Sequence, residues 1–182
     1  MGATDKALDE FVVRCGCNKA KLREKHMPPA DRLVRFPFNS TRKRMSTIIE
    51  NATGQGGYDK RIYMKGGADV IVDCCSKYLD ENGNEVPLTD VMKSTINSSI
   101  EKFAADALRT IVVGYKDIKE GECGPKHSDG DQVKDIELSG FTMICIFGIM
   151  DIIRAEVPDA VAAVQRAGVT VRMVTGDNII TA

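Results

Sequence analysis

The stretch from Leu33 to Ile49, LVRFPFNSTRKRMSTII, predicts the centre of the fold. Its two runs, Leu33–Phe36 and Met45–Ile49, are short and contain several β-branched or aromatic residues, which favours strands. The residues between them are polar and basic, as is typical of a turn. We therefore expect two strands joined as a hairpin.

Apolar spacing predicts the other elements of the first 150 residues. Helices are expected at Thr4–Cys15, capped by Thr4 or Asp5, at Ala68–Tyr78 and at Val91–Ala105. Strands are expected at Arg61–Lys65, Thr110–Tyr115 and Phe141–Met150, the last buried on both faces because its apolar run is nearly continuous. Asn82-Gly83 predicts a turn, and the Gly-rich segments 51–57 and 119–135 predict loops. This irregular mixture favours an α+β fold.

The pattern changes after Met150. A predicted helix at Val157–Ala167 and a predicted strand at Val169–Val174 lead directly into Thr175-Gly176-Asp177. That order is typical of an α/β unit. We therefore expect a first domain at residues 1–150 and a fragment of a second at 151–182.

Composition excludes several classes of protein. The net charge of −1 gives no field that would attract nucleic acid. The longest apolar run, Phe141–Met150, is shorter than the roughly 20 residues that cross a bilayer. The six cysteines include no C-x-x-C pair, and only two histidines accompany them, so we expect reduced cytosolic thiols and no structural zinc site.

Thr175-Gly176-Asp177 follows a predicted strand, and ligands gather at the carboxyl ends of strands in α/β folds. Thr175 offers a hydroxyl, Gly176 allows close approach to a phosphate, and Asp177 offers a carboxylate to a metal ion. The alternative is an ordinary turn in which Asp177 caps the next helix.

Lys65-Gly66-Gly67 also ends a predicted strand, and a lysine beside two glycines can reach a phosphate or a ribose. The chain has no G-x-x-x-x-G-K-[ST] string, so this is not a P-loop. The alternative is a solvated lysine at a strand end.

Phe38 precedes three consecutive cations, Arg42, Lys43 and Arg44, and Met45 follows them. An aromatic ring here can stack on adenine, with Met45 packed nearby. The alternative is that Phe38 belongs to the core and the cations form a solvated hairpin tip.

Together and in this order, these motifs resemble the large cytoplasmic loop of P-type ATPases, most nearly the plasma-membrane calcium pumps. The similar strings are F-x-x-x-R-K-x-M-S from Phe38, K-G-G from Lys65, L-R-T from Leu108 and M-V-T-G-D-N from Met173. The resemblance covers almost the whole chain. It implies a nucleotide-binding domain with an antiparallel sheet flanked by helices, followed by a fragment of the phosphorylation domain.

The resemblance also implies residue roles around ATP. Phe38 would stack on adenine beside Met45, Lys65-Gly66-Gly67 would line the pocket floor, and Thr4 and Asp5 would meet the adenine side. Arg109 would contact the phosphates, and Thr175-Gly176-Asp177 would help bind the γ-phosphate and Mg²⁺. Asp151 and Arg154 would belong to the interdomain hinge.

Several positions depart from the family pattern. Asp5 replaces a glutamate, Gly67 replaces an alanine, and Ile152 replaces the hinge proline. Ser40 stands where some pumps carry an arginine, which removes one phosphate partner.

The family's phosphorylated string D-K-T-G-T and its Mg²⁺ motif G-D-G-x-N-D do not occur in these 182 residues. We therefore expect a monomeric, soluble ATP-binding piece of a membrane pump, with no catalytic residue and no complete metal site of its own. Its expected partners are ATP and the pump's phosphorylation, actuator and transmembrane domains. A free-standing ATP-binding module, a pump for another cation and a haloacid-dehalogenase-type phosphatase are the alternatives.

Overall fold

A computed structural model describes residues 2–26, 34–50, 59–118, 135–150 and 152–175. Seven strands form one sheet in the spatial order β1-β2-β3-β6-β7-β4-β5. All neighbouring strands are antiparallel except β4 and β7, which are parallel. The strands are β1 (Val34–Asn39), β2 (Arg44–Glu50), β3 (Lys60–Gly67), β4 (Cys75–Leu79), β5 (Glu85–Pro87), β6 (Leu108–Ile118) and β7 (Phe141–Met150).

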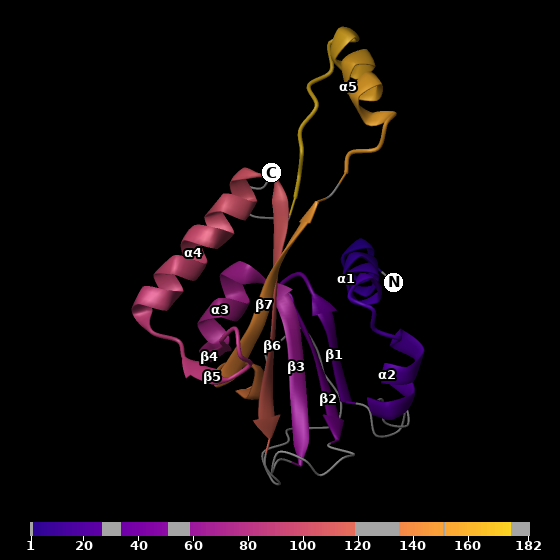
Figure 1. Ribbon diagram of the computed structural model, residues 1–182. Coiled ribbons are helices and arrows are strands. Elements are labelled where there is room, and N and C mark those ends of the chain that lie inside the picture. The colour runs from indigo at the N-terminus through magenta and orange to yellow at the C-terminus, as the bar shows by residue number, and fades with distance from the viewer. Residues whose placement is uncertain (1, 27–33, 51–58, 119–134, 151, 176–182) are drawn as a thin grey trace.

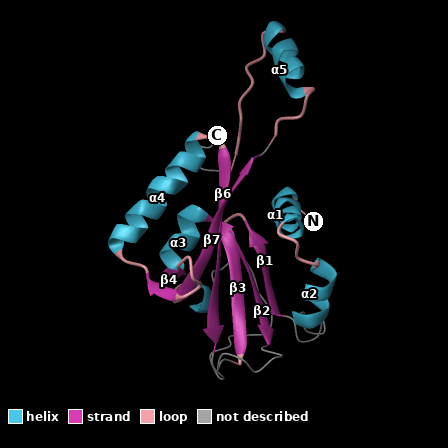
Figure 2. Cartoon of the chain, viewed as in Figure 1, coloured by secondary structure: helices cyan, strands magenta, loops and turns pink. Residues whose placement is uncertain are grey.

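Helices lie on both sides of the strands (Figure 1). Helices α3 (Ala68–Cys74) and α4 (Asp90–Ala105) lie on one side, and α1 (Ala3–Arg14) and α2 (Lys19–His26) lie on the other. A 3-10 turn, η2 (Asp135–Glu137), precedes β7, and α5 (Val157–Arg166) stands apart from the sheet beyond its end (Figure 2). The predicted antiparallel sheet flanked by helices is therefore confirmed.

The hydrophobic core lies between the sheet and helices α3 and α4. It is formed by side chains that alternate along the strands, such as Ile62 and Met64 of β3, and by Ile71 of α3 and Ile96 of α4. These side chains are at most 7% exposed. The alternation of β3 leaves Tyr63 and Lys65 on the opposite face, toward α1.

The helix predicted at Ala68–Tyr78 is only half correct. Helix α3 ends at Cys74, and residues from Cys75 onward form β4, which pairs with β7 on one side and β5 on the other. Two ladders of backbone hydrogen bonds outweigh the helical spacing of the apolar residues. The predicted turn at Asn82-Gly83 is confirmed, with Gly83 at φ +80° between β4 and β5.

Two predictions about the C-terminal third are wrong. Strand β7 is buried only at Phe141, Thr142 and Met143, because only this first part pairs on both sides. Residues 169–174 form no strand, and within the described chain no strand pairs with them. Without a neighbouring ladder an apolar run does not become a strand, and Val174 is 95% exposed.

The start of helix α1 differs from expectation. Helix α1 begins at Ala3 with Gly2 at its N-cap, so neither Thr4 nor Asp5 caps it, and Gly16 follows its C-cap at φ +80°. The charged segment from Lys19 forms a helix, because its lysine, arginine and glutamate side chains favour helices.

Among the helices of the described ranges, none is long and apolar enough to cross a bilayer. The predicted loop at 51–57 and residues 119–134 of the other lie outside these ranges.

Candidate functional site

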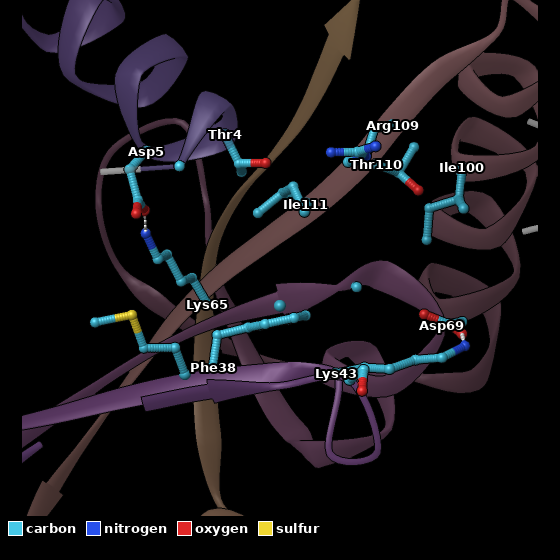
Figure 3. A pocket seen from close by; sticks show the side chains of 15 residues that line it. Thr4, Asp5, Phe38, Lys43, Lys65, Asp69, Ile100, Arg109, Thr110 and Ile111 are labelled. Atoms are coloured by element: carbon cyan, nitrogen blue, oxygen red, sulfur yellow. Dashed lines mark hydrogen bonds and ion pairs between the residues drawn. The ribbon is translucent and has the colours of Figure 1, made fainter. Parts of the chain in front are cut away.

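A cavity of about 540 Å³ opens between the start of α1, the β1–β2 turn and the ends of β3 and β6. This volume suits a small-molecule ligand. Its walls contain all eight residues to which the family resemblance gives a role in nucleotide binding, five of which are labelled in Figure 3. They are Thr4, Asp5, Phe38, Met45, Lys65, Gly66, Gly67 and Arg109.

A bulge in β1 turns Phe38 toward the cavity. Phe36 pairs with Ser46 and Asn39 pairs with Arg44, so β1 uses one residue more than β2 over this interval. Because one extra residue reverses the facing of those that follow, Phe36 lies in the core while Phe38 lies on the other face. Phe36 is 2% exposed and Phe38 is 62% exposed. Phe38 is therefore not a core residue.

Met45 and Lys65 extend the same wall as Phe38. They are directly paired across β2 and β3, which places both side chains on one face of the sheet. Their neighbours in the two strands, Arg44, Ser46, Met64 and Gly66, are buried. Phe38 and Met45 thus form an apolar surface, and Lys65 lies at its edge.

Asp5 and Lys65 form an ion pair at one side of the cavity. The Lys65 ammonium donates a hydrogen bond to the Asp5 carboxylate, joining the first turn of α1 to β3. This hydrogen bond, which outweighs the effect of burial, holds the pKa of Asp5 below its usual value of 3.8. Asp5 is therefore ionised near neutral pH.

Gly66 lets β3 and the β1–β2 turn come unusually close. A Cβ atom at Gly66 would lie 2.4 Å from the carbonyl oxygen of Lys43 and 2.9 Å from Cα of Arg44. That same Lys43 oxygen accepts a hydrogen bond from the Gly67 N–H at 3.0 Å. Gly66 therefore lines the cavity at a position where any side chain would collide with the backbone of Lys43.

Lys43 and Asp69 are cavity residues that the sequence analysis did not assign. Their side chains form an ion pair of 2.9 Å, and in Figure 3 it lies on the other side of Phe38 from the Asp5–Lys65 pair. The sequence presents Lys43 as one of three consecutive cations in a polar turn, without a role of its own. Asp69 lies in the first turn of α3, just after Gly66-Gly67. A carboxylate is common at this position because it interacts favourably with the helix dipole, so the sequence does not indicate a ligand site there.

The far wall comes from β6 and α4. Arg109 and Thr110 lie across the cavity from Phe38 (Figure 3), and Ile100 of α4 and Ile111 add apolar surface. Ser40, which replaces an arginine of some family members, also lines the cavity.

The second predicted site, Thr175-Gly176-Asp177, and the predicted hinge are described only in part. Thr175 is exposed and is not among the residues that line the cavity. Arg154 is exposed, and its Nε atom lies 4.0 Å from Oε1 of Glu156. Asp151, Gly176 and Asp177 lie outside the described residues. Within the described part of the chain, no three His, Cys, Asp or Glu side chains come together in a way that could hold a metal ion.

The cysteines of the described ranges do not line the cavity. The five in the described ranges are free thiols. Burial raises the pKa of Cys75 to about 12 and raises that of Cys74, so both remain protonated near neutral pH. These thiols are therefore poor nucleophiles and poor metal ligands.

The cavity suits a ligand that is both aromatic and anionic. An exposed phenylalanine ring provides a stacking surface, and the three cations Lys43, Lys65 and Arg109 exceed the two carboxylates Asp5 and Asp69 by one charge.

Comparisons with known proteins identify the family of the chain. The family model described as P-type ATPase, cytoplasmic domain N, matches residues 2–156. The chain is 44% identical over 98% of its length to calcium-transporting ATPase 3, plasma membrane-type, of Oryza sativa subsp. japonica. It is 37% identical over 98% of its length to calcium-transporting ATPase PAT1 of Dictyostelium discoideum, and 41% identical over 85% to plasma membrane calcium-transporting ATPase 4 of Bos taurus.

The chain spans only a small part of these relatives, 16%, 14% and 12% of their lengths in the same order. The match to the family model nevertheless covers most of this chain, including every residue that lines the cavity. The chain belongs to the P-type ATPase family, through its cytoplasmic domain N.

Proposed function

We propose that this chain binds ATP in the cavity as part of a calcium-transporting P-type pump. The observation that carries the proposal is the exposed Phe38 ring, set in a cavity of about 540 Å³ that Lys43, Lys65 and Arg109 also line. A purine needs a flat apolar partner, and a triphosphate needs cationic donors. The cavity supplies both within one small volume.

The lining residues would divide the roles among them. Adenine stacks on Phe38 and packs against Met45, while Thr4 and Asp5 offer polar groups to the edge of the purine. Lys65 and Arg109 attract the phosphates, with Lys43 as a third cation. Gly66 and Gly67 form a floor that the ligand approaches without meeting side chains.

The chemistry that follows binding requires other parts of the pump. In a P-type pump ATP phosphorylates an aspartate, and the string D-K-T-G-T that would carry it is not among these 182 residues. We propose that this chain holds ATP for delivery to that aspartate, which lies elsewhere in the pump. Mg²⁺ would join the phosphates there, with Thr175, Gly176 and Asp177 contributing in the assembled phosphorylation domain.

Calcium as the transported ion rests on the relatives, whose names state calcium transport. Similarity over 98% of the chain to two such pumps favours a pump over a free-standing nucleotide-binding module. We propose residues 1–150 as the nucleotide-binding domain and 151–182 as a fragment of the phosphorylation domain, with Asp151 and Arg154 at the hinge. The actuator and transmembrane domains of the same pump would be the partners.

Titration of the chain with ATP and with adenosine, followed by calorimetry and by NMR, tests the proposal. We expect saturable binding of both ligands at millimolar concentrations, with shifts of the Phe38 ring signals and little change when Mg²⁺ is added. GTP serves as the comparison ligand, because its purine edge differs while its phosphates do not. No response to millimolar ATP in the folded chain would overturn the proposal.

A further inference from the structure

The Lys43–Asp69 ion pair lies in the wall of the cavity, at the side opposite Asp5 and Lys65. The Lys43 ammonium donates to the Asp69 carboxylate at 2.9 Å, and both side chains are nearly half exposed, at 43% and 47%. The two residues come from different elements, the β1–β2 turn and the first turn of α3. Both remain within reach of a ligand in the cavity.

The backbone of Lys43 is held independently of this ion pair. Its N–H donates to the Asn39 carbonyl at 2.7 Å, and its own carbonyl accepts from the Gly67 N–H at 3.0 Å. The Asn39 side chain also accepts from the Thr41 N–H at 2.7 Å, which fixes the turn. Loss of the ion pair would therefore free the ammonium without moving the strand that carries Phe38.

Charge balance makes Asp69 matter to an anionic ligand. Among the residues lining the cavity, three side chains are cationic and two are anionic, and the Lys43 charge is directly opposed by Asp69. Exposed ion pairs of this kind are weak, so a polyphosphate can compete for the ammonium. The Asp69 carboxylate also repels any phosphate that approaches Lys43.

We propose that Asp69 is a specificity-determining residue that lowers the affinity of the cavity for phosphorylated nucleotides relative to the nucleoside. Asp69 competes with the phosphate chain for Lys43, whereas adenine stacking on Phe38 is unaffected. This inference rests on the proposed binding of ATP. In addition, the Asp69 carboxylate in the cavity wall reduces the difference in affinity between ATP and adenosine.

The test compares Asp69→Asn with Asp73→Asn. Both substitutions change the net charge equally, because each replaces an aspartate by asparagine. Asp73 lies on the same helix one turn later, but its side chain is 81% exposed and does not line the cavity. Adenosine, ADP and ATP are titrated without Mg²⁺ at low ionic strength. We expect Asp69→Asn to bind ATP and ADP about two- to fivefold more tightly than the unmodified chain, with adenosine affinity unchanged. Asp73→Asn should bind all three ligands as the unmodified chain does.

A double-mutant cycle makes the cause explicit. In a Lys43→Gln background, Asp69→Asn should give a smaller gain for ATP, because the ammonium that Asp69 neutralises is already absent. In the chain that retains Lys43, a higher salt concentration should reduce the gain in ATP affinity that Asp69→Asn produces. If Asp69→Asn does not fold, Asp69→Ser removes the same charge and replaces it in every arm.

The outcomes separate the inference from the function on which it rests. If the unmodified chain binds neither adenosine nor ATP, the proposed function itself fails. If it binds both, but Asp69→Asn leaves ATP affinity unchanged or lowers it, the function stands and the role of Asp69 is overturned. An equal gain in Asp73→Asn would also overturn it, since net charge alone would then explain the effect.

Discussion

The Glu137 carboxylate accepts two hydrogen bonds from the Arg42 guanidinium, at 2.8 and 3.0 Å, and both side chains are buried. Ser46 donates to the same carboxylate at 2.5 Å, and Arg44 donates to the Glu137 carbonyl at 3.0 Å. These contacts join Glu137 to the β1–β2 turn and to β2. Arg42 also donates to the Pro37 carbonyl at 3.3 Å, immediately before Phe38, so this buried network supports the stacking surface.

Glu137→Gln should destabilise the chain strongly, because it leaves the Arg42 guanidinium buried without its compensating carboxylate. Breaking a buried pair from one side typically costs about 3–5 kcal/mol of unfolding free energy. Urea unfolding measures the change. Asp117→Asn is the control, because it breaks the more exposed Arg61–Asp117 pair, which should contribute no more than about 1 kcal/mol. Similar losses in the two variants would show that burial of the Glu137 pair has no special importance.

Phe38→Ala and Phe36→Ala should separate binding from stability. Phe38 is 62% exposed in the cavity, so its truncation should weaken ATP and adenosine binding by about 1–3 kcal/mol with little loss of stability. Phe36 is 2% exposed in the core, so its truncation should cost about 3–5 kcal/mol of unfolding free energy. Calorimetric titration and urea unfolding of both variants provide the measurements. Unchanged affinity in a folded Phe38→Ala chain would exclude stacking on this ring.

The contrast between Phe36 and Phe38 marks what the sequence alone can predict. The hairpin follows from two apolar runs and a polar turn, and the structure confirms it. The bulge that sends the two rings to opposite faces depends on one extra residue in the pairing of β1 with β2. Spacing of i and i+2 would place both rings on one face. The residues alone left Phe38 open between adenine stacking and the core, and the resemblance to a known family favoured stacking.

Long-range contacts set the remaining limit. Arg42 and Glu137 are 95 residues apart, and nothing in the local pattern indicates that these two charges meet in the interior. The Asp69 carboxylate reaches the cavity because Gly67 bonds back to Lys43, a contact between β3 and the β1–β2 turn. Likewise, Cys75 onward becomes β4 because β7 and β5 provide ladders, which helical spacing does not anticipate.

Gly66→Ala should disrupt the chain, while Gly67→Ala should be tolerated. A Cβ atom at Gly66 would lie 2.4 Å from a backbone oxygen of Lys43, and two paired strands cannot separate without losing hydrogen bonds. At Gly67 the nearest atom, at 2.5 Å, belongs to the Asp69 side chain, which can rotate away. Thermal unfolding should show a clear loss for Gly66→Ala and a small change for Gly67→Ala. Equal stability of the two variants would contradict the close approach at Gly66.

The Asp5–Lys65 pair should make stability depend on pH at the acid end. Since the Lys65 ammonium lowers the pKa of Asp5 below 3.8, the folded state binds this proton less readily than the unfolded state. The pair therefore stabilises the fold at pH values above 3.8, and its contribution disappears as the pH falls through the lowered pKa. The effect is small, because the Asp5 side chain is 39% exposed and solvent screens the pair.

Unfolding free energies of the unmodified chain and of Asp5→Asn, measured from neutral pH down to the lowest pH at which both remain folded, test this dependence. The unmodified chain should be the more stable of the two near neutral pH, and the difference should shrink toward zero in acid, where protonated Asp5 resembles asparagine. Lys65→Gln should lose the same pH-dependent part, because without the ammonium the pKa of Asp5 returns toward 3.8. A difference between Asp5→Asn and the unmodified chain that stays constant across this range would mean that Asp5 acts through its shape and hydrogen bonds and that its charge contributes nothing.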